Sequence, residues 1–378
     1  MNYSRKLSSG RVRRLVIKTV ERCNLNCTYC YMYHHADQSY LHRPPVMSEQ
    51  IFDCVLDRAA EYCQSRPGHT MALHFHGGEP MLMRPEQFDG MARRATQRLG
   101  EHLEGFSLQT NATLVNSKWI AVLQRHHVAV SVSMDGPAEV HDRSRVDHFR
   151  QGSYERVVDG LKHLTESGLA PKVLCVIDPS ASGSQVYRHL RSLGVRVMNF
   201  LLPDATHDSW PALYREVKSL ALSEFLSSAF DAWYTEDNPD IHVILFEELL
   251  RTLAGGVPIT DAIGSPIPDY LVIDTDGSIQ SNDVFKVCDE GVAESGLTVL
   301  NRGFDDDHGA NETFQALISG QMGLPTACKG CPEEKICGGG YLPHRYSRAN
   351  GFNNPSVWCA DLLAWIGHVR DIMKQDAA

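Results

Sequence analysis

The sequence has no run of apolar residues that approaches the ~18 residues of a membrane span. From Met1 to Arg14 it is polar and basic and has no apolar core of a secretory signal. Positive charge is also in short supply, since 36 Lys and Arg face 46 Asp and Glu, a formal net charge of −10. This balance argues against nucleic acid or an anionic membrane as the main partner. Without an export signal, the 11 cysteines indicate metal ligands in the reducing cytoplasm and not disulfides.

Short apolar runs alternate with amphipathic stretches along much of the 378-residue chain. The runs are typical of strands and fall at 13–19, 71–76, 105–109, 127–133, 171–177 and 195–202. The stretches between them are typical of helices and fall at 48–64, 85–100, 116–126, 153–167 and 183–193. Ser48 is the expected N-cap of the first. Such repeats predict an α/β fold whose parallel sheet curls into a partial (β/α)6 TIM-like barrel, because a closed barrel needs eight units.

The pattern changes after the sixth run. We assign residues 1–210 to the barrel and 211–268 to a helical bridging segment with two helices within 212–254. Residues 269–378 then form a loop-rich C-terminal domain. It should begin with a β-hairpin at 269–283, because apolar residues 270–273 and 278–279 flank a turn sequence at 274–277.

Three cysteines lie close together after the first run. Cys23, Cys27 and Cys30 are spaced C-x3-C-x2-C, with Tyr29 before the third. Three thiolates on so short a loop can hold three irons of a [4Fe–4S] cubane and leave the fourth iron open. The spacing therefore predicts a cluster that binds a small molecule at its open iron.

A second cysteine group lies near the C-terminus. It consists of Cys328, Cys331, Cys337 and, 22 residues later, Cys359. Four cysteines can form a closed zinc site or ligate every iron of a [4Fe–4S] cluster, and the spacing alone is compatible with both.

Polar residues follow three of the predicted strands. Gly77, Gly78, Glu79 and Pro80 end the second run, Asn111 ends the third, and the fourth ends with Ser133 and Asp135. The carboxyl ends of parallel strands are where ligands bind in such folds. These segments predict a ligand site, although ordinary turn chemistry accounts for each one singly.

The order of these motifs resembles that of the radical S-adenosylmethionine (SAM) enzymes, and the C-terminal cysteines resemble their SPASM extension. The resemblance implies that SAM chelates the open iron and is cleaved by one electron to a 5′-deoxyadenosyl radical, which takes a hydrogen from the substrate. It implies SAM and [4Fe–4S] clusters as cofactors and a flavodoxin- or ferredoxin-type electron donor. Carried over by motif, the SAM-binding residues are Tyr29, Gly77, Gly78, Glu79, Pro80, Asn111, Ser133, Asp135 and Arg145.

One departure from the SPASM pattern is informative. Two cysteines of its first auxiliary cluster are replaced here by Asn282 and Tyr341. We therefore expect two clusters in all, with one auxiliary cluster on the four C-terminal cysteines. Asp283 follows Asn282, and the matching aspartate serves as a base in sulfatase-maturing relatives, so the resemblance makes Asp283 the catalytic base.

Finer similarity concerns residues 31–40, 337–346 and 354–359, which resemble the Fxs-type, cyclophane-forming (triceptide) peptide maturases. That resemblance implies an intrapeptide C–C crosslink from a side-chain Cβ to an aromatic ring in a ribosomal precursor peptide. The stretch before Cys23 is too short for a winged-helix leader-binding domain, so leader recognition would use the barrel, the SPASM surface or a separate protein. The alternatives are thioether formation, epimerisation or formylglycine formation, or a non-catalytic electron carrier or zinc protein.

Overall fold

The computed structural model describes residues 12–264, 268–305, 310–318 and 321–376, so almost all of the polar stretch from Met1 to Arg14 lies outside the described residues. The strands are β1 (Arg14–Val20), β2 (Met71–Gly77), β3 (Leu103–Thr110), β4 (Ala129–Ser133), β5 (Lys172–Val176), β6 (Val197–Leu201), β7 (His242–Val243), β8 (Tyr270–Ile273), β9 (Ser278–Gln280) and β10 (Glu294–Thr298). The helices are α1 (Glu49–Gln64), α2 (Pro85–Leu99), α3 (Ser117–Arg125), α4 (Ala138–Ser144), α5 (Tyr154–Glu166), α6 (Gly183–Ser192), α7 (Trp210–Leu213), α8 (Ala221–Glu236), α9 (Ile244–Leu253), α10 (Glu312–Ile318), α11 (Glu334–Cys337) and α12 (Cys359–Asp376).

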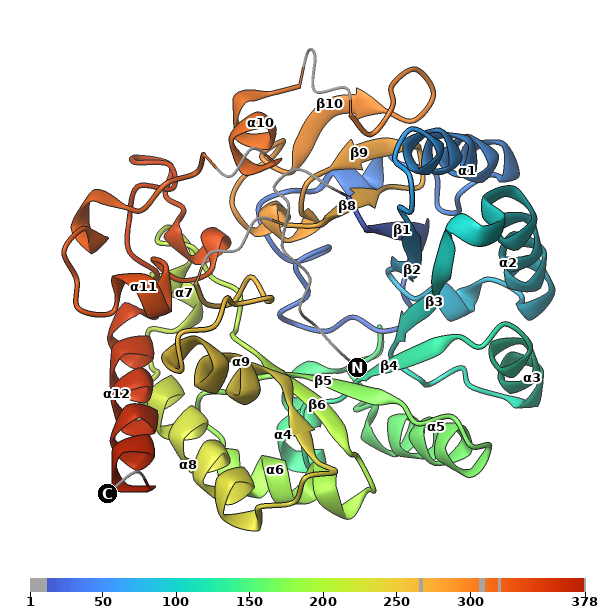
Figure 1. Ribbon diagram of the computed structural model, residues 1–378. Coiled ribbons are helices and arrows are strands. Elements are labelled where there is room, and N and C mark those ends of the chain that lie inside the picture. The colour runs from blue at the N-terminus through green and yellow to red at the C-terminus, as the bar shows by residue number, and fades with distance from the viewer. Residues whose placement is uncertain (1–11, 265–267, 306–309, 319–320, 377–378) are drawn as a thin grey trace.

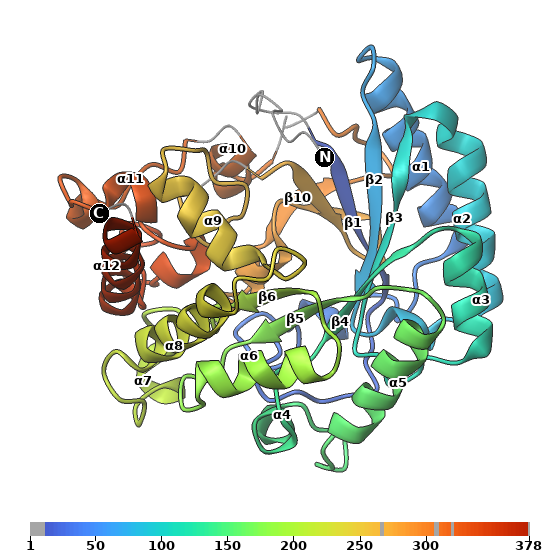
Figure 2. The ribbon, with the colours of Figure 1, turned by 60° about the horizontal axis from the view of Figure 1, so that its bottom comes forward.

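The strands form one 10-stranded sheet in the order β10-β9-β8-β1-β2-β3-β4-β5-β6-β7. From β8 through β7 neighbouring strands are parallel, and β9 and β10 continue the sheet antiparallel. The sheet curls with α1, α2, α3, α5 and α6 on its outside, as Figures 1 and 2 show. This confirms the predicted α/β partial barrel. Sequence reasoning missed the short α4 and β7, because seven and two residues are too few for a periodic signal.

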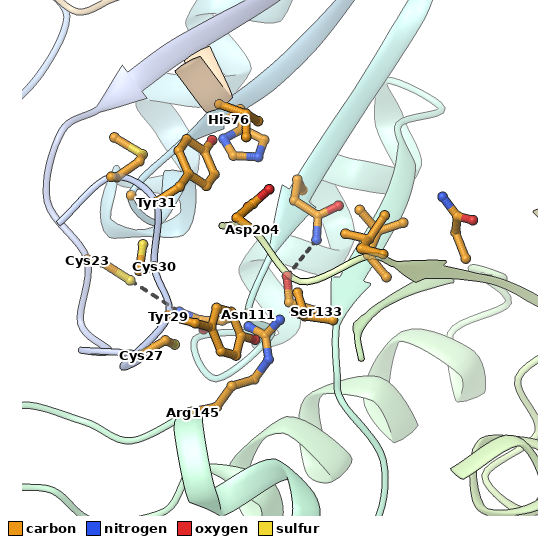
Figure 3. A pocket seen from close by; sticks show the side chains of 18 of the residues that line it. Cys23, Cys27, Tyr29, Cys30, Tyr31, His76, Asn111, Ser133, Arg145 and Asp204 are labelled. Carbon is orange, nitrogen blue, oxygen red and sulfur yellow. Dashed lines mark hydrogen bonds between the residues drawn. The ribbon is translucent and has the colours of Figure 1, made fainter. Parts of the chain in front are cut away.

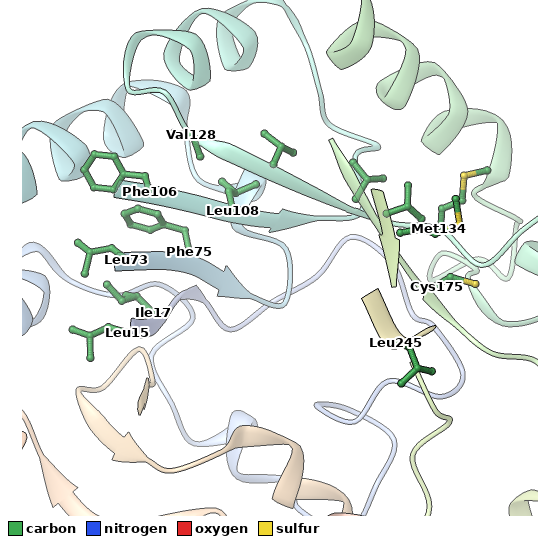
Figure 4. Close-up of a cluster of buried hydrophobic side chains, with 14 of the residues drawn as sticks. Leu15, Ile17, Leu73, Phe75, Phe106, Leu108, Val128, Met134, Cys175 and Leu245 are labelled. Carbon is green, nitrogen blue, oxygen red and sulfur yellow. The ribbon is translucent and has the colours of Figure 1, made fainter. Parts of the chain in front are cut away.

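Alternation along the strands separates the core from the barrel interior. In β2, Leu73 and Phe75 are fully buried under the outer helices, whereas His74 and His76 lie on the opposite face. The outward side chains of β1 to β4 form the apolar layer of Figure 4. The ring of Phe75 meets that of Phe88 from α2 edge-on at 4.8 Å between centroids. The inward face of the strands is thereby left for polar side chains.

Helix α1 begins as its sequence predicts. The Ser48 hydroxyl accepts a hydrogen bond of 3.2 Å from the Ile51 N–H, which satisfies one of the first free amides of the helix. Its buried face includes Phe52, Val55 and Leu56, and it packs on the sheet beside α2.

The predicted hairpin exists as β8 and β9, but it lies on the barrel sheet. Strand β8 pairs in parallel with β1, with Leu15 opposite Leu271. One continuous sheet therefore runs across the boundary that the sequence suggested at residue 269. The hairpin carries Asn282 and Asp283, the start of a 3-10 helix η4 (Asp283–Val287), to the cysteine loop after β1.

The last helix, α12, lies along α8, as Figure 1 shows. The Asp361 carboxylate accepts a 3.0 Å hydrogen bond from the Ser223 N–H near the start of α8. The two helices of the predicted bridging segment are α8 and α9, separated by β7. Within the described residues, no helix combines the length and apolarity needed to cross a bilayer.

Candidate active site

Cys23, Cys27 and Cys30 line one cavity of about 330 Å³ at the carboxyl ends of the strands (Figure 3). Their loop is folded tightly, since the Cys30 N–H donates to the Cys27 carbonyl at 3.0 Å. The Cys23 sulfur accepts from the Leu25 N–H at 3.4 Å and from the Asn111 side-chain amide at 3.8 Å. Amide donors of this kind tune the sulfurs of an iron–sulfur cluster.

The donor set of this loop fits a metal cluster. Burial raises the pKa of Cys30 to about 12 and also raises the pKa values of Cys23 and Cys27. Thiolates in such a place form when a cationic metal centre replaces the proton. The three sulfurs would ligate three irons of a [4Fe–4S] cluster and leave its fourth iron without a protein ligand.

Glu79 lies beside this loop as a buried carboxylate at the end of β2. Its oxygens accept hydrogen bonds from Met81 N at 2.9 Å, Thr110 Oγ1 at 2.8 Å and Asn111 N at 2.7 Å. Burial nevertheless raises the pKa of Glu79 to about 7. Its Oε2 keeps one acceptor position, and a cation there would hold the group ionised. The contact of Glu79 with the ammonium group of SAM stays a prediction.

Arg145 lines the cavity and is held by a neighbour. Its Nε donates to Asp135 Oδ2 at 2.8 Å, and the Tyr29 hydroxyl donates to the same oxygen at 2.5 Å. The Arg145 guanidinium also lies over the Tyr29 ring, 5.4 Å from its centroid. Asp135 therefore fixes the orientation of the Arg145 guanidinium. The remaining N–H groups of Arg145 are available to a carboxylate.

Most of the predicted SAM-binding residues reach the same cavity. Those that line it are Tyr29, Gly77, Gly78, Glu79, Asn111, Ser133 and Arg145. Pro80 and Asp135 lie outside the lining, where Pro80 begins a 3-10 helix η2 (Pro80–Leu82). Gln109 joins the set, since its amide donates to the Ser133 hydroxyl at 2.8 Å and its own carbonyl oxygen has no partner within the described chain.

The two glycines before Glu79 permit a close backbone approach. A Cβ at Gly78 would lie 2.1 Å from the Tyr33 hydroxyl oxygen and 2.3 Å from the Arg22 carbonyl oxygen. Gly77 has a φ of 142° and would place a Cβ 2.2 Å from the Val20 carbonyl oxygen. The loop that carries Glu79 is thus seated directly against the cysteine loop.

Replacing Gly78 by alanine should weaken SAM binding by about tenfold or more, because the added methyl group pushes the Glu79 loop away from the cysteine loop. Equilibrium dialysis with labelled SAM, under anaerobic conditions, measures this. The matched control is Gly90→Ala in α2, where a Cβ meets open space. Equal SAM affinity of the two variants would contradict the expected contact.

The predicted catalytic base, Asp283, lies behind Tyr31 and outside the cavity lining. The Tyr31 hydroxyl donates to Asp283 Oδ2 at 2.5 Å, and the ammonium of Lys18 is ion-paired with the same oxygen. Burial alone would raise the pKa of Asp283, but the Lys18 charge beside it holds that pKa well below its usual value. Asp283 is therefore ionised, and it reaches the cavity through the Tyr31 hydroxyl.

Other groups in the cavity wall were missed by sequence reasoning. His76 lines the cavity and accepts the Gly77 N–H on Nδ1 at 2.8 Å, while burial lowers its pKa to about 4 and keeps it neutral. Alternation within 71–77 could have placed His76 on the inner face. Asp204 and Tyr341 also line the cavity, and Tyr341 lies beside the Asn282 side chain. The two residues that replace SPASM cysteines are thus in contact with each other.

The four C-terminal cysteines, which are the predicted ligands of the auxiliary cluster, lie around one pocket. Cys328, Cys331, Cys337 and Cys359 line one small pocket between α11 and α12. In the described parts of the chain, no three His, Cys, Asp or Glu side chains converge on a single point as the ligands of one metal ion do. The remaining cysteines, Cys54, Cys63, Cys175 and Cys288, are free and lie outside both groups.

Comparison with known sequences agrees with this geometry. Residues 17–193 match the family described as the radical SAM superfamily. The cysteine-type anaerobic sulfatase-maturating enzyme of Clostridium novyi is 24% identical over 356 residues, which span 91% of each chain. The serine-type anaerobic sulfatase-maturating enzyme of Bacteroides thetaiotaomicron is 26% identical over 380 residues, 94% of this chain and 89% of the other.

Solved structures show the same fold. Native anSMEcpe with bound AdoMet is similar with a TM-score of 0.83 at 21% identity, covering 96% of this chain and 99% of that chain. Streptococcus suis SuiB bound to its precursor peptide SuiA is similar with a TM-score of 0.62 at 15% identity, covering 93% of this chain and 76% of that chain. The chain therefore shares the fold of these structures over nearly its whole length.

Proposed function

Because residues 17–193 match the radical SAM superfamily and the chain has the radical SAM fold, we propose that the protein is a radical SAM enzyme that oxidises a side chain of a peptide or protein. The observation that carries this is the cavity itself. It brings the cysteine loop together with Glu79, Ser133 and Arg145, although they come from separate strands and loops.

The residues present fit SAM and two [4Fe–4S] clusters. Cys23, Cys27 and Cys30 would hold one cluster, and Cys328, Cys331, Cys337 and Cys359 would hold the other. Bound at the first cluster, SAM would supply the 5′-deoxyadenosyl radical that removes a hydrogen atom from the substrate. Glu79 would bind its ammonium group and Arg145 its carboxylate, which orients the cofactor toward the interior of the barrel.

The substrate class comes from the relatives. The curated ones mature sulfatases, anSMEcpe is solved with the peptide Cp18Cys, and SuiB is solved with the precursor peptide SuiA. A cavity that opens at the strand ends between barrel and C-terminal segments suits an extended peptide. The similarity over nearly the full length of the sulfatase-maturating enzymes makes formylglycine formation the first reaction to test.

Cyclophane formation is the second candidate. The sequence likeness at 31–40, 337–346 and 354–359 favours it. In both reactions the substrate radical must lose one electron and one proton. Besides Glu79, three carboxylates are near the cavity for that proton: Asp204 and Asp261 line it, and Asp283 reaches it through the Tyr31 hydroxyl.

The test is anaerobic co-expression with small peptides encoded near the gene, followed by tandem mass spectrometry. Loss of two hydrogens with linked fragment ions indicates a crosslink. Exchange of a cysteine sulfur for oxygen together with loss of two hydrogens, or loss of two hydrogens confined to a serine, indicates formylglycine. The accompanying measurement is the release of 5′-deoxyadenosine from SAM, with dithionite as the reductant. If a reconstituted, iron-loaded protein released none, the proposal would be contradicted.

A further inference from the structure

Asp204 is a carboxylate that the predicted catalytic set does not use. It follows β6 and lines the cavity, and Figure 3 shows its side chain on the side of Tyr31 and His76. No hydrogen bond to its carboxylate occurs among the described residues, and the Nε2 of His344 lies 4.0 Å from its Oδ1. Burial lowers the pKa of His344 to about 3, so that ring is neutral and supplies no counter-charge to Asp204.

We propose that Asp204 is the general base of the reaction and takes the substrate proton directly, while Asp283 serves as the ion-pair partner of Lys18. The inference rests on the proposed function, because it assigns a residue to the same cavity. A base must reach the proton that it removes. Asp204 lines the cavity, whereas Asp283 is separated from it by Tyr31 and already binds Lys18.

The step balances as follows. After hydrogen-atom removal, the substrate radical gives one electron to an acceptor of the iron–sulfur class and one proton to a carboxylate oxygen of Asp204. The carboxylate becomes a carboxylic acid, and the product has two hydrogens fewer at the new bond. The proton then returns to solvent through the open side of the cavity, either through water or when the product is exchanged for the next substrate.

The electrostatic surroundings suit this task. Burial, and then the charges of Asp261 and Asp283, raise the pKa of Asp204 to about 7, near the value at which a general base works best at neutral pH. Asp261 also lines the cavity and accepts a 3.3 Å hydrogen bond from the Tyr270 hydroxyl. The titratable groups that face Asp204 from the surrounding segments are Asp261, Asp283, His344, Tyr31, Tyr214, Tyr341 and Cys288.

The first arm of the test needs no substrate. A folded-state pKa raised above the unfolded value of 3.8 means that protonation of Asp204 favours the folded state. This stabilisation is present at low pH and is lost as pH rises through about 7. The melting temperature of the anaerobic holoprotein should therefore fall relative to that of Asp204→Asn between about pH 4 and 7, with no further fall above that range. Exposed Asp240→Asn is the control, with no such trend. A difference between wild type and Asp204→Asn that does not change with pH would overturn the proposal.

The second arm uses the peptide identified by co-expression. Asp204→Asn should still release 5′-deoxyadenosine, but product formation should fall by about 100-fold or more and lose its rising pH limb near 7. Asp261→Asn should move that limb to lower pH, because it removes a negative charge that raises the pKa of Asp204. Wild-type kcat with a raised KM alone would overturn the assignment. Failure of wild type to cleave SAM would contradict the proposed function instead, and the titration arm would still decide on Asp204.

Discussion

Replacing Cys30 by alanine should reduce the release of 5′-deoxyadenosine from SAM to the level of a protein-free control. Cys30 is one of the three cysteines of the loop that lines the cavity. Two thiolates cannot hold three irons, so the cluster is lost and SAM has no metal to chelate. The measurement is chromatography of 5′-deoxyadenosine after anaerobic reduction by dithionite, with iron content determined on the same sample.

Two variants make this result specific. Cys54→Ala on α1 changes a free cysteine that lies outside the cavity, and it should keep both iron and SAM cleavage. Cys359→Ala changes the C-terminal group, and it should lose about half of the iron while SAM cleavage continues. If Cys30→Ala still cleaved SAM, the loop would not be the radical-generating site and the proposed function would be wrong.

The barrel could be predicted because its strands and helices have strong local signals. Runs 13–19 and 71–76 alternate or are continuously apolar, and they became β1 and β2 within one or two residues. The partner of the hairpin could not be predicted in this way. Pairing of β8 with β1 depends on which edge of the sheet is free once the barrel has folded. The residues at 270–273 carry no local sequence signal that identifies this edge.

The two cysteine groups were predictable because metal ligands have characteristic spacings in the chain. Asp204 had no such signal. It stands alone after β6, and it becomes part of the cavity only when the segments after α9 and before α12 close over the barrel. The buried Lys18 was equally hidden, since a lysine within an apolar run is ordinarily expected to reach solvent.

Replacing Lys18 is the second change with a large expected effect. Lys18 is fully buried on the inner face of β1, and its ammonium is ion-paired with Asp283 and 3.3 Å from the Tyr31 hydroxyl oxygen. Lys18→Met should lower the free energy of unfolding by about 3–5 kcal/mol, because it leaves the Asp283 charge buried without a partner. Asp283→Asn should also be destabilising, because it leaves the Lys18 ammonium buried without its ion-pair partner. Both are measured by denaturant unfolding of the anaerobic protein, provided that the transition is two-state.

The double variant Lys18→Met/Asp283→Asn separates structure from chemistry. It removes both charges and keeps an amide oxygen that can accept the hydrogen bond of Tyr31, so it should recover most of the lost stability. If Asp283 acts as the partner of Lys18, the double variant should also recover peptide product relative to Asp283→Asn. If Asp283 were the base, stability would return without product, because no substitution at Lys18 can restore a proton acceptor. Product formation measured beside unfolding in the same three variants therefore distinguishes Asp283 from Asp204 as the group that takes the proton.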